Sequence, residues 1–142
     1  MAGVYRDRQG AIAVNVPTKR HKYGANPAWH CGDCGALAEP ATVCLACGSG
    51  DIVRFASKRE GARWQELCLM RRAGEISTLE RQPRYRIVVN GRPVCTYVAD
   101  FRYEELGGVP RVEDVKGMDT PVSRLKRKLM KACHDIDVIV VR

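Results

Sequence analysis

The sequence lacks any apolar run of the roughly 18 to 20 residues that a helix needs to cross a bilayer. Its first 20 residues, MAGVYRDRQGAIAVNVPTKR, also lack the apolar core of a secretory signal peptide. These two absences argue against a membrane protein and against an exported one. We therefore expect a soluble, cytoplasmic protein with no membrane partner.

Aromatic and acidic residues are both scarce. Two Trp and two Phe give weak support to a surface on which single-stranded bases would stack. The 24 Lys and Arg outnumber 16 Asp and Glu, which gives a net charge of +8. This excess predicts attraction to nucleic acid, although composition alone favours a solubilising surface equally. The clustering of basic residues at 19–22, 57–63, 71–74 and 123–131 favours nucleic acid.

Cysteine, by contrast, is abundant in this chain. Without a secretory signal, we do not expect the seven cysteines to form disulfides. The segment 30–50, HCGDCGALAEPATVCLACGSG, holds two C-x2-C pairs nine residues apart, each followed by glycine. This spacing is typical of a zinc ribbon, in which four thiolates close a structural Zn²⁺ site: Cys31, Cys34, Cys44 and Cys47. Redox pairs or an iron site are the alternatives, and no βαβ pattern surrounds either pair. The three remaining cysteines fall in apolar stretches and are expected to be buried thiols.

The rest of the chain predicts an α/β domain with a mixed sheet. Ser57 and Glu60 form a capping box for a helix that ends near Gly74. A strand at 84–89, an Asn-Gly turn, a returning strand at 93–105 and a strand at 111–116 follow. A second helix begins at Asp119 or Thr120, with Leu125, Leu129 and Ala132 expected toward the core. The chain closes on an apolar strand of the buried type, 136–142. The expected organisation is an arm or linker over 1–29, a zinc ribbon over 30–50 and the α/β domain over 51–142.

Charged residues lie in two of these strands, at positions where apolar ones are expected. Asp100 lies in the returning strand, and Asp114 and Lys116 share one face of the next. If these strands pair, Asp100 comes to lie beside Asp114. Two adjacent carboxylates repel each other unless a cation lies between them, and oxygen ligands favour Mg²⁺ or Mn²⁺. A structural salt bridge would explain one acid with Lys116 but not the second acid.

The sequence resembles the PD-(D/E)xK nuclease superfamily, which has the restriction-endonuclease-like fold. The motifs that carry the resemblance are Asp100 in VADF, Asp114-Val115-Lys116 in EDVKG, and the order helix, three strands, helix, strand. Further stretches, KYGA, FASKREGARWQEL, GEI, LERQPRYRI and RLKRKLMKA, are similar to a phage and prophage family of small endonucleases long catalogued as a domain of unknown function. The resemblance covers residues 55–142 and the KYGA stretch.

The resemblance implies a site and a reaction. It implies that Glu60 is a third acid and that the Val115 carbonyl is a metal ligand beside Asp100 and Asp114. It implies DNA hydrolysis to 5′-phosphate and 3′-hydroxyl ends, with Lys116 aligning the water. Glu60 also has a purely structural interpretation as the capping-box residue. Two departures stand out: Ala99 occupies the place of the motif's proline, and the zinc ribbon is inserted where the family has a short strand.

Basic residues near the proposed site are candidates for phosphate contacts, although such runs are usually solvated helix faces. The candidates are Lys58, Arg59, Lys126 and Lys128. None of His21, His30 and His134 is assigned to catalysis.

The sequence thus predicts a Mg²⁺- or Mn²⁺-dependent DNA endonuclease with structural zinc, encoded by a phage or prophage and acting in the bacterial cytoplasm. DNA recombination, replication or packaging is the expected setting, with a homodimer and other phage DNA-processing proteins as possible partners. Two alternatives stay open: a structure-selective junction or flap nuclease, and a non-catalytic zinc-ribbon protein that binds nucleic acid.

Overall fold

The computed structural model describes residues 4–6, 12–14, 26–40 and 42–142. Neither helix in this described part is long and apolar enough to cross a membrane. The elements, in chain order, are β1 (Val4–Arg6), β2 (Ile12–Val14), β3 (Ala28–Cys31), β4 (Ile52–Phe55), α1 (Lys58–Arg72), β5 (Ile76–Arg81), β6 (Arg84–Val89), β7 (Arg92–Val98), β8 (Phe101–Glu105), β9 (Val109–Val115), α2 (Pro121–His134) and β10 (Val138–Val141). Most of the arm expected over 1–29, including His21, lies outside the described residues.

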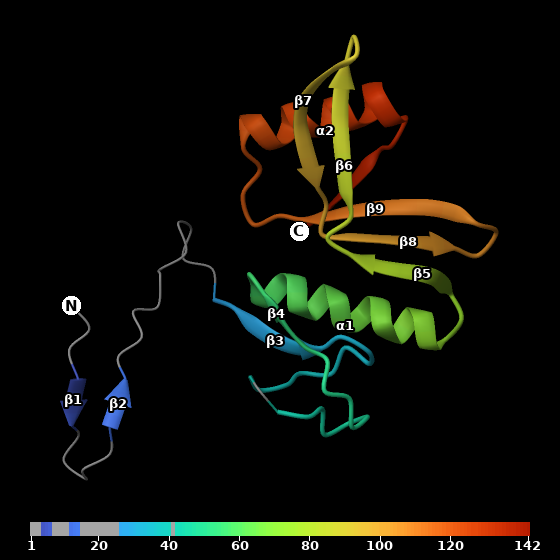
Figure 1. Ribbon diagram of the computed structural model, residues 1–142. Coiled ribbons are helices and arrows are strands. Elements are labelled where there is room, and N and C mark those ends of the chain that lie inside the picture. Colours follow the sequence, from blue (N-terminus) through green and yellow to red (C-terminus); the bar gives the residue numbers. More distant parts are fainter. Residues whose placement is uncertain (1–3, 7–11, 15–25, 41) are drawn as a thin grey trace.

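The fold is mixed α/β, with two helices and a mixed four-stranded sheet in the order β10-β9-β8-β5 (Figure 1). Strand β9 runs parallel to β10 and antiparallel to β8, and β8 is antiparallel to β5. The other described strands form three antiparallel pairs: β1–β2, β3–β4 and β6–β7. The predicted mixed sheet is therefore confirmed.

Helix α1 has the ends that its sequence predicts. The Ser57 hydroxyl accepts a hydrogen bond from the Glu60 amide at 3.2 Å, which satisfies one of the free amides of the first turn. At the other end Gly74 has a left-handed φ of 77°. Its amide donates to the Arg71 carbonyl at 3.1 Å and the next amide donates to the Met70 carbonyl at 3.0 Å, which is a Schellman motif.

The hairpin after α1 has β5 and β6 in its first arm and β7 and β8 in its second. It differs from the prediction because both arms bend. The expected returning strand is split into β7 and β8 at Ala99 and Asp100, and β5 was not expected at all. The bend on the first arm is made by Gln82, with a left-handed φ of 49°, and by Pro83, which cannot donate to a ladder. Two hydrogen bonds tie the bends together: Gln82 amide to Asp100 carbonyl at 2.9 Å, and Ala99 amide to Pro83 carbonyl at 3.2 Å. Asp100 thus lies where the chain leaves the sheet.

The two faces of the sheet bury two separate cores. Helix α1 contributes Trp64 and Leu67 to one, against Phe101, Tyr103 and Val115. The other gathers Ile87, Tyr97, Ala99, Val112 and Met130 between α2 and the β6–β7 hairpin. Because side chains of β9 alternate, Glu113 and Val115 face α1, whereas Val112 and Asp114 face the second core.

Two expectations about the C-terminal part are wrong. In α2 the predicted Leu129 does pack against the second core beside the buried Met130, but Leu125 is 58% exposed and Ala132 is exposed, so the inward face is rotated from the predicted one. Strand β10 is not buried, because it is the edge of the sheet and its Ile139 is 38% exposed. Apolar composition alone did not distinguish this edge from a central strand.

A buried ion pair joins α1 to the middle of the sheet. Arg63 donates to both oxygens of Glu113, at 2.9 and 2.7 Å, and Tyr103 donates to Glu113 Oε1 at 2.6 Å. Both oxygens of this buried carboxylate are therefore satisfied, as a charge in the interior requires.

Leu67→Ala tests the first core. Leu67 is fully buried, so its truncation should lower the free energy of unfolding by about 2–5 kcal/mol. Leu69→Ala, on the same helix at 52% exposure, should change it by no more than about 0.5 kcal/mol. Denaturant unfolding measures both, and equal effects would contradict this assignment of the helix face.

Candidate metal centre and active site

The four cysteines of the C-x2-C pairs converge on one point. Their sulfur atoms all lie within 4.8 Å of one another, with Cys31 and Cys47 3.6 Å apart and Cys34 and Cys44 3.5 Å apart. A tetrahedral Zn²⁺ with bonds of about 2.3 Å requires sulfur–sulfur separations of about 3.8 Å. The arrangement is thus compatible with a closed zinc site, and all seven cysteines are free of disulfides.

The backbone around the sulfurs forms two matching turns. Gly35 and Gly48, one residue after the second cysteine of each pair, have left-handed φ values of 77° and 76°. Their amides donate to the carbonyls of Cys31 and Cys44 at 3.0 and 2.7 Å. Glycine accepts this conformation without the steric cost of a Cβ, which explains its place after each pair.

We call residues 31–50, which hold the four clustered cysteines between β3 and β4, the cysteine module. It is braced against α1: Trp64 Nε1 donates to the Cys31 carbonyl at 2.9 Å. A side chain at Gly35 would come within 2.8 Å of the Gln65 backbone. On the other flank, the His30 ring lies against Gly61 and bonds the Gly35 carbonyl at 2.9 Å, so His30 supports the module without joining its sulfurs.

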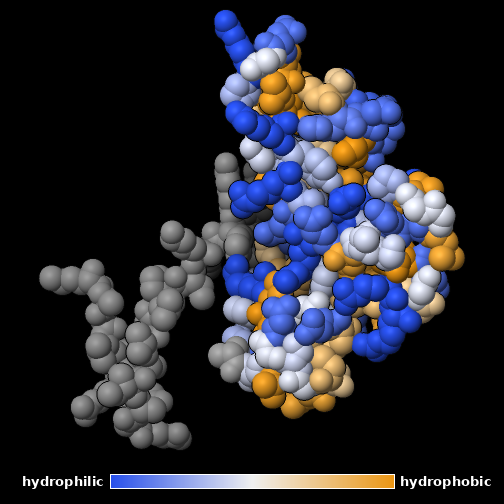
Figure 2. All heavy atoms as spheres, turned by 45° about the vertical axis from the view of Figure 1, so that its right-hand side comes forward, coloured by the Kyte–Doolittle hydropathy of each residue, from blue (hydrophilic) through white to orange (hydrophobic). Residues whose placement is uncertain are grey.

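The surface of the cysteine module differs from the rest of this basic protein. The module contains no Lys or Arg, and its charged side chains are Asp33 and Glu39. Leu37, Val43 and Leu45 are exposed at 73%, 58% and 101%, and apolar side chains appear at this end of the molecule in Figure 2. The module thus presents a mildly acidic and partly apolar surface that offers no Lys or Arg of its own to a phosphate.

The sheet register places Asp100 and Asp114 on facing strands, as predicted. Phe101 pairs with Glu113, which places Asp100 opposite Asp114 one step along. The Asp100 amide donates to the Glu113 carbonyl at 3.0 Å, and Asp100 Oδ2 accepts from the Val115 amide at 2.6 Å. Asp100 is thus attached to β9 through both its backbone and its side chain.

Asp114 is buried and has a different partner on each oxygen. Lys116 Nζ lies 2.9 Å from Oδ1, and the Tyr97 hydroxyl donates to Oδ2 at 2.8 Å. Both burial and the neighbouring Asp114 raise the pKa of Tyr97, which keeps its hydroxyl a donor. Lys116 continues β9, with its amide bonded to the Val141 carbonyl at 2.9 Å.

Glu60 approaches the aspartates from the first turn of α1. Its carboxylate accepts from the Ala56 amide at 3.3 Å and from the Ser57 hydroxyl at 3.4 Å, which completes the predicted capping box. Burial raises the pKa of Glu60, and the charges of Lys116 and Asp114 are felt there as well. Glu60 can therefore cap the helix and also belong to an acidic cluster with Asp100 and Asp114.

The acidic cluster contains three carboxylates, and Lys116 is the lysine beside it. Burial, Asp114 and Glu60 together raise the pKa of Asp100 to about 7, against the lowering effect of its bond to the Val115 amide. Among the described residues, the four cysteines are the only group of three or more possible ligands whose atoms all lie within 4.8 Å of one another, so the three carboxylates together are more widely spaced. Their carboxylate oxygens belong to the class of hard donors that Mg²⁺ and Mn²⁺ prefer in proteins.

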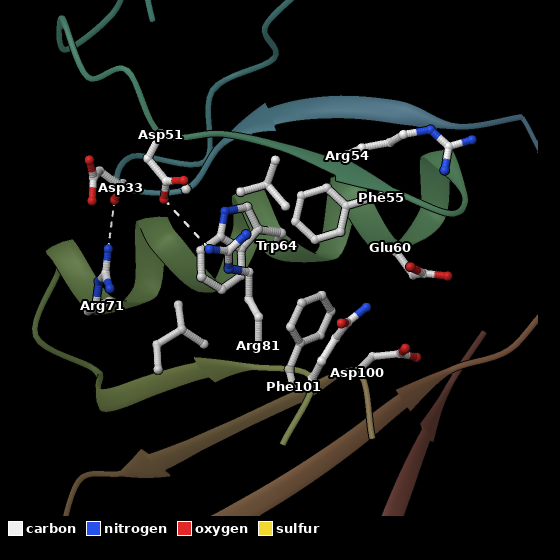
Figure 3. A pocket seen from close by; sticks show the side chains of 14 residues that line it. Asp33, Asp51, Arg54, Phe55, Glu60, Trp64, Arg71, Arg81, Asp100 and Phe101 are labelled. Carbon is white, nitrogen blue, oxygen red and sulfur yellow. Dashed lines mark hydrogen bonds and ion pairs between the residues drawn. The ribbon is translucent and has the colours of Figure 1, made fainter. Parts of the chain in front are cut away.

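Two cavities meet at Glu60. One, of about 590 Å³, runs between the cysteine module, α1 and β5, with Glu60 and Asp100 at one end and Asp33, Asp51 and Arg71 at the other (Figure 3). The second, of about 650 Å³, is lined by Lys58, Arg59, Glu60, Val115 and Lys116.

The four predicted phosphate contacts differ in position. Lys58 and Arg59 line the second cavity beside Glu60 and Lys116. Lys126 and Lys128 lie on α2, where Lys126 is half-buried and Lys128 is exposed.

Two residues near the acids, Tyr97 and Arg127, were not predicted from the sequence. Tyr97 reads as an ordinary strand residue, and only the strand register brings it to Asp114. Arg127 pairs with Asp119 at 2.7 Å and its charge reaches Tyr97 and Asp114. Its position within the basic run 123–131 gave no sign of this inward orientation.

Comparison with known proteins gives a family match. Residues 49–139 match the model of a family described as protein of unknown function (DUF1064). No curated protein and no solved structure matches the chain.

Cys34→Ser tests the zinc centre. Removing one of four thiolates should reduce bound zinc to near zero and lower the thermal unfolding temperature, because the cysteine module packs on α1. Zinc content is measured by elemental analysis of the purified protein. Cys133→Ser, outside the cluster, should keep its zinc, and loss from both variants would contradict the assignment.

Asp100→Asn tests the electrostatic cost of the cluster. A folded-state pKa near 7 lies above the unfolded value of about 4. The contribution of Asp100 to stability is then fully present below about pH 4 and is lost as pH rises through 7. Without added Mg²⁺ or Mn²⁺, Asp100→Asn should gain stability relative to wild type as pH rises from 5 to 8. Glu75→Gln, on an exposed turn, should follow wild type across the same unfolding series.

Proposed function

The chain belongs to the DUF1064 family, and we propose that it is a metal-dependent DNA endonuclease. The observation that carries the proposal is the meeting of Glu60 from α1, Asp100 from the bend before β8, and Asp114 with Lys116 from β9 and the residue after it. Asp100 and Asp114 lie on facing strands, Asp114 Oδ1 is 2.9 Å from Lys116 Nζ, and Glu60 lines one cavity with Asp100 and another with Lys116. A structural ion pair with Lys116 accounts for the buried Asp114 but not for Asp100, the half-buried acid on the facing strand.

The element order supports a restriction-endonuclease-like core. If β5–β6 and β7–β8 are each counted as one bent strand, the chain runs helix, three strands, helix, strand. Asp100 then lies at the bend of the second strand, and Asp114 and Lys116 at the end of the third. This is the arrangement that the resemblance to PD-(D/E)xK nucleases implies.

In this proposal each residue has a defined task. Glu60, Asp100, Asp114 and the Val115 carbonyl would hold Mg²⁺ or Mn²⁺, which supplies a Lewis acid for the phosphodiester and a means of activating water. Lys116 orients the attacking water and offsets the negative charge that develops on phosphorus. Attack in line with the departing 3′ oxygen leaves 5′-phosphate and 3′-hydroxyl ends.

The charge distribution supports a polyanionic substrate. Lys58 and Arg59 line the cavity that contains Glu60 and Lys116, and α2 contains further basic residues, among them Lys126 and Lys128. Several phosphate contacts would make binding strongly dependent on salt. We propose that the enzyme acts in phage DNA processing in the bacterial cytoplasm, with a second copy or other DNA-processing proteins as partners.

Lys116→Ala and Asp114→Ala test the chemistry on plasmid, flap and four-way-junction DNA, with Mg²⁺, Mn²⁺ or no added metal. Lys116→Ala should slow cutting by about 10²–10⁴-fold, as expected for loss of a group that assists proton transfer. Asp114→Ala should reduce cutting to background. Lys131→Ala and Asp137→Ala, which alter an exposed ion pair between α2 and the residue before β10, should cut like wild type.

The panel also separates the alternatives. Cutting of branched DNA with linear duplex intact would assign a structure-selective nuclease. DNA binding without wild-type cutting of any substrate would overturn the endonuclease and favour a nucleic-acid-binding protein.

A further inference from the structure

We propose that Tyr97 is a positioning residue that orients the carboxylate of Asp114 for metal binding. This inference rests on the proposed function, because it takes Asp114 to be a metal ligand. It assigns a role to a residue outside the D-x-K sequence, on a different hairpin from β9.

The two oxygens of Asp114 are held by groups of very different mobility. Oδ2 accepts from the Tyr97 hydroxyl at 2.8 Å, and Tyr97 is 4% exposed. Oδ1 contacts Lys116, whose side chain is 29% exposed and ends a flexible four-carbon stem. The tyrosine is therefore the fixed partner and the lysine the movable one.

The Tyr97 ring is held by packing rather than by its hydroxyl. It lies in the core formed by Ile87, Ala99, Val112 and Met130, between α2 and the β6–β7 hairpin. A ring fixed in this way presents its hydroxyl at one position, so the carboxylate of Asp114 is held in one orientation. Oδ1 then remains the oxygen open to a cation, and Lys116 exchanges this contact for the attacking water.

In other proteins, residues that hydrogen-bond to a metal ligand without touching the metal orient that ligand. Their loss typically costs 10- to 100-fold in metal affinity or activity. Tyr97→Phe removes the hydroxyl and leaves the packed ring. The chain provides a matched control in Tyr103, which is also 4% exposed and donates to Glu113, the residue next to Asp114, at 2.6 Å. Glu113 faces α1, where it is paired with Arg63, and it is not one of the proposed metal ligands.

The test is a calorimetric Mn²⁺ titration of the zinc-loaded full chain. Tyr97→Phe should weaken Mn²⁺ binding by about 10- to 100-fold, and Tyr103→Phe should bind Mn²⁺ like wild type. In the cleavage assay, Tyr97→Phe should need a correspondingly higher Mn²⁺ concentration for half-maximal rate, with DNA affinity unchanged. Unfolding curves of both variants show whether their stabilities match.

Three results would overturn the inference. The first is an unchanged Mn²⁺ affinity in Tyr97→Phe, and the second is an equal loss in both variants, which would indicate general loosening. The third is Mn²⁺ binding by wild type that Asp114→Ala leaves intact. That result would also remove the metal site on which the proposed function depends, whereas the first two leave the endonuclease standing.

Discussion

The proposed site depends on one constraint: two aspartates held opposite each other where the hairpin leaves the sheet. The pairing of Phe101 with Glu113 fixes this juxtaposition, and the bond from the Val115 amide to Asp100 secures it at 2.6 Å. Burial and the neighbouring acids raise the pKa of Asp100 to about 7, so the arrangement opposes folding at neutral pH. A cost of this kind, sustained by the surrounding fold, is typical of functional sites.

The surrounding structure is arranged to support this point. The Arg63–Glu113 ion pair fastens α1 to β9, and α1 in turn brings Glu60 to the aspartates. On the opposite face of the sheet, the second core holds Tyr97 against Asp114. The two faces thus support the two ends of the same cluster with different interactions, one ionic and one largely apolar.

The cysteine module has a comparable supporting role. It packs on the flank of α1 that contains Trp64, and it forms one wall of the cavity that ends at Glu60 and Asp100. Its lack of basic residues separates it from the positively charged remainder of the chain. The module therefore packs against the helix that contributes Glu60.

The sequence alone determined what depends on local chemistry. The spacing of the cysteines predicted their cluster, the Ser57 and Gly74 signals defined α1, and the Asn-Gly turn located the β6–β7 hairpin, because each is set by a few neighbouring residues. Period-two alternation also predicted that Asp114 and Lys116 share a face. Tertiary structure decided the rest: the bend at Asp100, the inward face of α2, the edge position of β10, and the contacts of Tyr97 and Arg63. These depend on strand register and packing between segments far apart in the chain, and no local pattern in the sequence encodes them.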